Sequence, residues 1–174
     1  MVCASQSQPS DYHEDMRLGR PSRLPRDRYI GERTVAFHVS VDKRQNLFTS
    51  REVVDPVVGR LTRAAREFDC VVPIFCFMPD HAHIMLKGLR ESSDLLAAMT
   101  KFKSLTGFWL YKMGLPCLQQ DFFDHVMRVG DDWRNQALYI ANNPVRAGLA
   151  TDWSQYPFTG AVDCDLQDIV CGFA

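Results

Sequence analysis

The sequence predicts an α+β sandwich, in which helices pack on one mostly antiparallel β-sheet. Short segments rich in β-branched and aromatic residues predict strands, and longer segments with apolar residues three and four positions apart predict helices. Along the chain the order is strand, helix, strand, strand, helix, candidate strand, helix. Only two residues separate the second strand from the third, which is short enough for an antiparallel hairpin.

The first half of the domain begins with the strand TVAFHVSV (34–41). The next helix is expected at 56–69, where the apolar residues share one helical face and Pro56 suits the first turn. VVPIFCFM (71–78) and HAHIMLKG (81–88) are then two strands joined at Pro79-Asp80. Because both are apolar on each face, we expect them in the middle of the sheet.

The second half contains two longer helical segments. Residues 92–114 predict a helix that Ser92 or Ser93 caps and that Gly114 ends. Residues 121–129, DFFDHVMRV, are a candidate short strand. Residues 131–150 predict a helix with an acidic start and a break at Pro144, because a proline disfavours helical backbone at the preceding residue.

Length and composition fit one compact soluble domain: 174 residues, of which 46% are hydrophobic and 24% charged. No apolar run approaches the roughly 18 residues that a membrane span needs. The start of the chain has neither the basic end nor the apolar stretch of a signal peptide, so we expect a cytoplasmic protein. The six cysteines form no C-x-x-C pair and predict no thiolate zinc site; Cys70 and Cys76 are expected to be small buried residues.

Basic residues are concentrated toward the N-terminal end. Residues 17–66 carry twelve Arg and Lys against five Asp and Glu, whereas the last 24 residues carry four aspartates and no basic residue. We therefore expect a basic arm (1–28), a domain (29–158) and an acidic tail (159–174), which is either solvated or folded over the basic surface. The arm is predicted to contact the phosphates of a polyanion such as a nucleic acid, with a solvated arm as the alternative; its arginines are Arg17, Arg20, Arg23, Arg26 and Arg28.

Two histidines interrupt an apolar strand in MPDHAHIML (78–86). Side chains alternate along a strand, so His81 and His83 point to the same face and can share one metal ion. The alternative is that both are packed core residues with hydrogen-bond partners.

A second candidate is YIANNPVRAGL (139–149). Tyr139 and Asn143 are four residues apart, so on a helix they share one face. A phenolic oxygen is a nucleophile once its proton is removed, and an amide oxygen can bind a metal. The alternative is that Tyr139 packs on the core and Asn143 caps the helix.

MPDHAHIML, DFFDHVMR and YIANNPVRAGL, in this order and spacing, resemble the single-tyrosine HUH transposases, and in particular the REP-associated tyrosine transposases of bacteria. The resemblance runs from about Arg23 to Phe158. One difference is Ala82, where the family usually has a bulkier apolar residue. That position needs only an apolar side chain on the opposite face, so we expect the metal site to survive.

The resemblance implies a ferredoxin-like (RRM-like) sheet with both histidines on a central strand. It implies that His81, His83 and Asn143 bind Mg²⁺ or Mn²⁺ and that Tyr139 is the nucleophile. Such transposases cleave and rejoin single-stranded DNA next to hairpins, here REP-like repeats, through a 5′-phosphotyrosine intermediate. A monomer or a homodimer is expected, with no membrane partner.

Two further residues have lesser predicted roles. His125, in DFFDHVMR, recurs in the family, either as a hydrogen-bonded scaffold residue or as a group that orients a ligand or contacts phosphate. Arg146 is a candidate phosphate contact or a solvated arginine.

Two other function classes stay open. One is a zinc hydrolase with His81, His83 and His125 as ligands. The other is a non-catalytic module that binds single-stranded nucleic acid on an open sheet.

Overall fold

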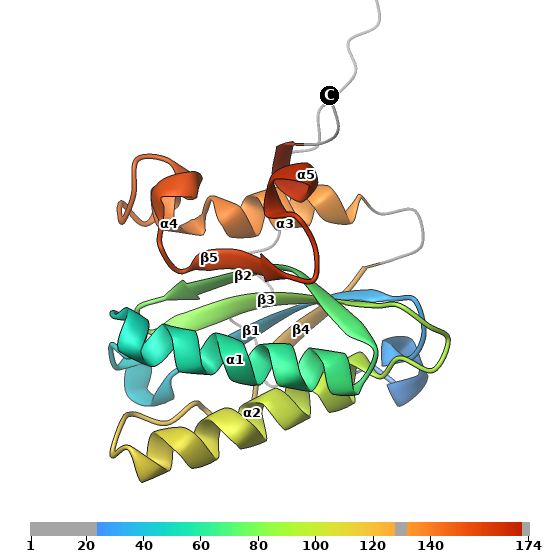
Figure 1. Cartoon of the computed structure of the whole chain (residues 1–174), viewed down its shortest axis with the longest axis horizontal. Helices are drawn as coiled ribbons and strands as arrows, with labels where there is room; N and C mark the ends of the chain where they lie inside the picture. The colour runs from blue at the N-terminus through green and yellow to red at the C-terminus, as the bar shows by residue number, and fades with distance from the viewer. Residues whose placement is uncertain (1–23, 128–131, 172–174) are drawn as a thin grey trace, which may run out of the picture.

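A five-stranded sheet lies between two layers of helices in the computed structural model, which describes residues 24–127 and 132–171 (Figure 1). The strands are β1 (Thr34–Ser40), β2 (Cys70–Met78), β3 (His81–Gly88), β4 (Phe123–Val126) and β5 (Thr159–Val162). The helices are α1 (Arg51–Glu67), α2 (Leu95–Lys112), α3 (Trp133–Ala141), α4 (Asn143–Arg146) and α5 (Leu166–Cys171). Three short 3-10 turns complete the described elements: η3 (Arg26–Tyr29), η4 (Asp42–Arg44) and η5 (Trp153–Gln155).

The strand order in the sheet is β4-β1-β3-β2-β5, and every neighbouring pair is antiparallel. The first four strands and the helices α1 and α2 follow the βαββαβ order, which confirms the ferredoxin-like fold. β5 extends this sheet along the outer edge of β2. The hairpin expected at Pro79-Asp80 joins β2 to β3, with Met78 opposite His81.

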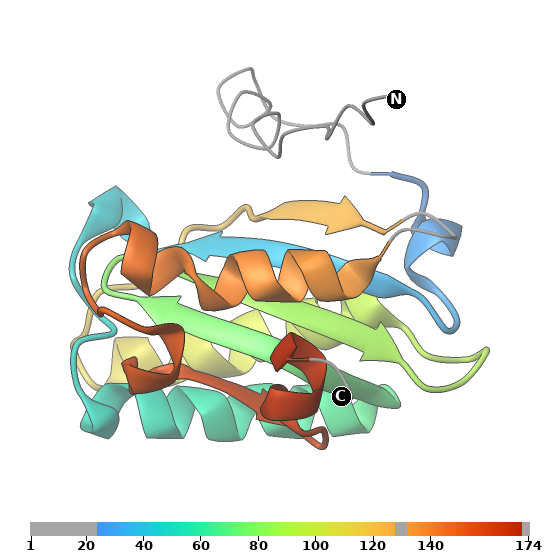
Figure 2. The same ribbon diagram turned by 90° about the horizontal axis from the view of Figure 1, so that it is seen from above.

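Different helices cover the two faces of the sheet. α1 and α2 pack on one face, where the larger core cluster includes Phe37, Phe77 and Ile84. α3 and α5 pack on the other face, where a smaller cluster includes Met85 and Ile140. Figure 2 shows α3 and α4 running across this second face. The described residues therefore do not form the open sheet that the non-catalytic alternative requires. None of the helices in this part of the chain is long and apolar enough to cross a bilayer.

Helix α1 begins five residues earlier than predicted. Ser50 has an extended backbone and the helix starts at Arg51, so Pro56 lies inside it rather than in its first turn. A proline there removes one main-chain donor. The helix forms nonetheless because Val57 and Leu61 bury its apolar face in the larger core cluster.

Asp94 caps helix α2, in place of the predicted Ser92 or Ser93. The Asp94 carboxylate accepts a hydrogen bond from the Ala97 main-chain N–H at 2.9 Å. The buried Ser93 hydroxyl instead donates to the Asp69 carbonyl oxygen at 2.7 Å, which ties the start of α2 to the turn between α1 and β2.

The folded domain begins before residue 29. Tyr29 is fully buried in η3, and its hydroxyl donates to the Asp124 carboxylate on β4. Arg26 forms an ion pair with Asp94 at 2.7 Å. The predicted arm therefore ends before Arg26, which corrects the boundary at 28. Arg28 also lies in η3, whereas the remaining three arginines of the predicted arm lie outside the described residues: Arg17, Arg20 and Arg23.

Residues 159–171 belong to the fold, which corrects the predicted acidic tail. β5 pairs with β2, with Val162 opposite Val72 and Thr159 opposite Cys76. α5 buries Ile169 in the smaller cluster. The aspartates that suggested a solvated tail are exposed, and they alternate with these buried apolar residues. Truncation after Phe158 would thus remove an edge strand as well as negative charge.

The close approach at Gly88 provides a test of the fold. A Cβ atom on Gly88, at the end of β3, would overlap the main-chain oxygen of Gly31. Because backbone cannot rotate away as a side chain can, Gly88→Ala should lower the free energy of unfolding by about 1–3 kcal/mol in urea.

A matched control lies in α1. A Cβ atom added to Gly59 would meet no heavy atom within 4 Å, so Gly59→Ala should raise the free energy of unfolding by about 0.5–1 kcal/mol. A Gly88→Ala protein as stable as the wild type would contradict the close approach.

Candidate metal centre and nucleophile

A third histidine joins the predicted pair. β1 lies beside β3 with His38 directly opposite His83, and Cys76 of β2 lies on the other side of His83. His81 is two residues along β3, opposite Ser40. Because alternate residues of a strand share a face, all three imidazoles belong to the face that α3 covers.

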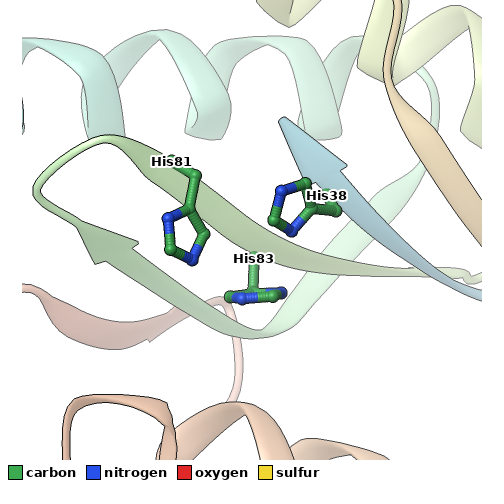
Figure 3. Close-up of side chains that lie close together, drawn as sticks. All are labelled: His38, His81 and His83. Atoms are coloured by element: carbon green, nitrogen blue, oxygen red, sulfur yellow. The ribbon is translucent and has the colours of Figure 1, made fainter. Parts of the chain in front are cut away.

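The three rings converge from β1 and β3 (Figure 3). The ring centroids of His38 and His81 are 4.9 Å apart, those of His38 and His83 4.8 Å, and those of His81 and His83 5.0 Å. One nitrogen from each ring lies within 4.8 Å of the other two. In the part of the chain that the structure describes, this is the group of His, Cys, Asp or Glu side chains with the geometry of a metal site.

Ala82 lies between the two predicted histidines and points to the opposite face. Its side chain is 1% exposed and belongs to the larger core cluster under α1 and α2. The position thus takes an apolar side chain, and its small size leaves the histidines on the other face undisturbed.

Asp80 orients His81. An Asp80 carboxylate oxygen lies 2.6 Å from His81 Nδ1, so Nε2 is the ring nitrogen left to bind a metal. Arg44 approaches the other oxygen of Asp80 at 3.4 Å. Burial raises the pKa of Asp80, but the hydrogen bond to His81 and the nearby charges outweigh it and lower that pKa below its usual value.

Burial keeps the three imidazoles neutral at pH 7. It lowers the pKa of His38 to about 4, and the charges of His81 and Arg44 add to this effect. It also lowers the pKa of His83 well below the usual value, and lowers the pKa of His81. A neutral imidazole has the lone pair that metal binding requires.

One nitrogen of His38 is buried without a partner. His38 Nε2 lies 3.2 Å from Ser40 Oγ. His38 Nδ1 is buried and has no hydrogen-bond partner among the described residues. Leaving such an atom unpaired costs about 1–3 kcal/mol, and a bound metal ion would remove that cost. The donor set therefore fits a metal ion.

Tyr139 and Asn143 lie on the two helices that cover the same face. α3 ends at Ala141, and α4 begins at Asn143 with Pro144 in its first turn, so the break predicted at Pro144 is present. Ile140 lies in the smaller cluster with residues of β2 that pair with the two predicted histidines.

The charge of Arg146 acts on both parts of the candidate site. Its guanidinium carbon lies 4.6 Å from the centre of the Tyr139 ring. Its charge also contributes to the lowered pKa of His83. Asn143 Nδ2 donates to the Ile140 carbonyl oxygen at 3.3 Å, which leaves Oδ1 as the atom able to bind a metal. The ligand role of Asn143 and the nucleophile role of Tyr139 stay predictions.

His125 lies apart from the histidine cluster. It is exposed on the edge strand β4, opposite Ala36. The structure therefore does not bring together the zinc ligands His81, His83 and His125; His38 takes the third place. His125 instead lines a pocket of about 470 Å³ that Arg28 and Arg33 also line.

His38 is the site residue that the sequence reasoning missed. It interrupts the apolar strand TVAFHVSV just as His81 and His83 interrupt theirs. Its place opposite His83 depends on strand order and register, which the sequence does not show.

Two cysteines fulfil the structural role predicted for them. Cys70 and Cys76 are 2% and 0% exposed. Burial raises the pKa of the Cys70 thiol to about 12 and that of Cys76 to about 11, so both stay protonated at pH 7.

Acid should destabilise the metal-free protein through His38. Its pKa is about 4 when folded against 6.5 as the ordinary value, so the unfolded chain takes up the proton first as the pH falls. The free energy of unfolding keeps this contribution above about pH 6.5 and loses on the order of 2–3 kcal/mol of it by about pH 4.5. Urea unfolding at both pH values measures the loss in wild type and in His38→Gln. The variant should lose less stability, and an equal loss in both proteins would contradict the burial argument.

Comparison with known proteins adds a likeness of fold. No family model matches the sequence, and no curated protein matches it. Among solved structures, the chain is similar to a REP-associated tyrosine transposase bound to a REP hairpin, with a TM-score of 0.66 and 22% sequence identity over 82% of each chain. The two proteins share a fold, in agreement with the family resemblance that the three motifs indicate.

Proposed function

We propose that this protein is a metal-dependent enzyme that cleaves and rejoins single-stranded DNA beside hairpins, as a transposase of the bacterial cytoplasm does. One observation carries the proposal. In a fold shared with a hairpin-bound transposase, the histidine cluster and the helix with Tyr139 lie on the same face of the sheet.

Tyr139 would be the nucleophile. Its phenolic oxygen loses its proton and attacks a backbone phosphorus, and the bond from phosphorus to the 3′-oxygen breaks. The 3′-oxygen takes up a proton, and the downstream strand stays attached to Tyr139 as a 5′-phosphotyrosine. Because one phosphoester replaces another, the 3′-hydroxyl of a second strand can attack the phosphotyrosine, join the strands and release Tyr139 without ATP.

His81, His83 and Asn143 would hold the Mg²⁺ or Mn²⁺ that the resemblance implies. When bound there, the ion supplies a Lewis acid that polarises a phosphate oxygen and orients the scissile bond. Asp80 fixes the ring of His81 through the 2.6 Å contact. Arg146, whose guanidinium lies beside the Tyr139 ring, would bind the phosphate that Tyr139 attacks.

Arginines near the N-terminal end would bind the DNA backbone. Arg28 and Arg33 line the pocket that His125 also lines, at the point where the described chain begins. Arg26 is held by Asp94, so its charge is partly neutralised. We infer that Arg17, Arg20 and Arg23 supply most of the phosphate contacts of the arm.

Removing one oxygen from Tyr139 tests the proposal. Tyr139→Phe keeps the ring and its contact with Arg146, so the free energy of unfolding should fall by no more than about 1.5 kcal/mol, the contribution of one hydrogen bond. The covalent adduct and the cleaved strand should both disappear when the protein is incubated with a labelled hairpin-bearing single strand and Mn²⁺. A denaturing gel measures both products.

Tyr111→Phe is the matched control. Tyr111 is 77% exposed on α2, on the opposite side of the sheet, and its variant should form the adduct as the wild type does. A peptide map that places the label on another tyrosine would contradict the assignment of Tyr139 as the nucleophile. Cleavage without any adduct would favour a hydrolase instead.

Deleting residues 1–23 tests the arm while keeping Arg26 and Tyr29, which pack on the domain. The slope of log affinity against log salt should flatten by about 2, because each phosphate contact on a single strand contributes about 0.7 and three arginines are lost. Fluorescence anisotropy at several salt concentrations gives the slope. Arg63→Ala, which removes an exposed charge from α1, should leave the slope unchanged. Unchanged affinity and slope after the deletion would show that the arm does not contact DNA.

A further inference from the structure

We propose that His38 is a third metal ligand beside His81 and His83, and that this three-imidazole site binds Zn²⁺ or Co²⁺ in preference to Mg²⁺. The inference deepens the proposed function, and it rests on that function because it concerns the same metal site. It changes both the ligand set and the metal that the family resemblance implies.

The distances suit a single ion. Two nitrogens that each bind one ion at about 2.1 Å lie at most about 4.2 Å apart. The three ligand nitrogens already lie within 4.8 Å of one another. Their backbones are held by the β1–β3 ladder, in which His38 faces His83, so small rotations of the side chains bring the nitrogens into bonding range.

The hydrogen bonds of His81 and His38 each involve one ring nitrogen, so the other nitrogen of each ring can bind a metal ion. Asp80 occupies Nδ1 of His81, which leaves Nε2. Ser40 lies beside Nε2 of His38, which leaves the buried Nδ1 without a partner among the described residues. Metal-binding histidines typically use their second nitrogen in this way, on a carboxylate or another oxygen.

The chemistry of the donors selects the metal. Mg²⁺ prefers carboxylate and water oxygens in an octahedron, whereas neutral imidazole suits zinc and the other late first-row cations. The histidine group contains no carboxylate, and Asp80 contacts His81 rather than completing the set. Affinity should therefore rise in the order Mg²⁺, Mn²⁺, Co²⁺, Zn²⁺. The remaining coordination positions are open to Asn143 Oδ1, water or a DNA phosphate.

Titration of the full-length, metal-free protein with Co²⁺ tests the inference without measuring activity. Bound Co²⁺ should give a visible absorption band, and competition should show Zn²⁺ displacing it and Mg²⁺ failing to do so at about a hundredfold excess. His38→Ala should weaken Co²⁺ binding at least about tenfold, since even an outer contact of a metal ligand is worth tenfold or more. Circular dichroism checks that the variant folds.

Two further variants keep the test decisive. His38→Phe fills the space beside Phe123 with a ring that cannot bind metal, so it should reproduce the weaker binding if His38→Ala fails to fold. His125→Ala removes an exposed histidine outside the cluster and should leave Co²⁺ affinity unchanged. Wild-type affinity in a folded His38 variant, or Mg²⁺ binding as tight as Co²⁺ binding, overturns the inference.

The failure of this inference and that of the proposed function are distinguishable. Tyr139→Phe should bind Co²⁺ as the wild type does. A Co²⁺ site that needs His38, in a protein that never forms a DNA adduct, would support the metal inference and reject the proposed function. An adduct in a protein whose Co²⁺ affinity does not depend on His38 would reject the metal inference alone.

Discussion

The antiparallel pairing of β1 with β3 is the constraint on which the candidate site depends. Its register places His38 opposite His83 and Ser40 opposite His81. A shift of one residue in this pairing would turn His38 toward the core under α1 and α2, because neighbouring side chains of a strand point to opposite faces. The hydrophobic residues Val35, Phe37 and Val39 prevent that shift, since all three are buried in that core.

Burial gives the three histidines their chemical character. α3 and its apolar residues cover this face of the sheet, and the desolvation lowers the pKa values of all three imidazoles. Arg44 and Arg146 act in the same direction on His83. Neutral imidazoles at close range do not repel one another as cations would, and they present lone pairs to a common point. The neutral charge state that lets the three imidazoles lie close together in the folded protein is also the state that metal binding requires.

The second helical layer distinguishes this protein from a ferredoxin-like sheet with one bare face. α3, which contains Tyr139, and α4, which begins at Asn143, run across the face of the sheet that holds the histidines, and the break between the helices lies next to Asn143. β5 and α5 complete the layer on the side of β2. Tyr156 adds to this packing, because its buried hydroxyl donates to the Phe77 carbonyl oxygen. The C-terminal segment therefore supports the helical layer that contains Tyr139 and Asn143 and is not a tail.

Local patterns in the sequence determined the first four strands, the hairpin at Pro79-Asp80, the shared face of His81 and His83, and the helix break at Pro144. Each depends on the chemistry of neighbouring residues, which a short stretch of sequence contains. Tertiary structure decided that His38 joins the cluster, that His125 does not, and that residues 159–171 are folded. These outcomes depend on which strands become neighbours and in what register, and that is set by burying the apolar surface of the whole sheet.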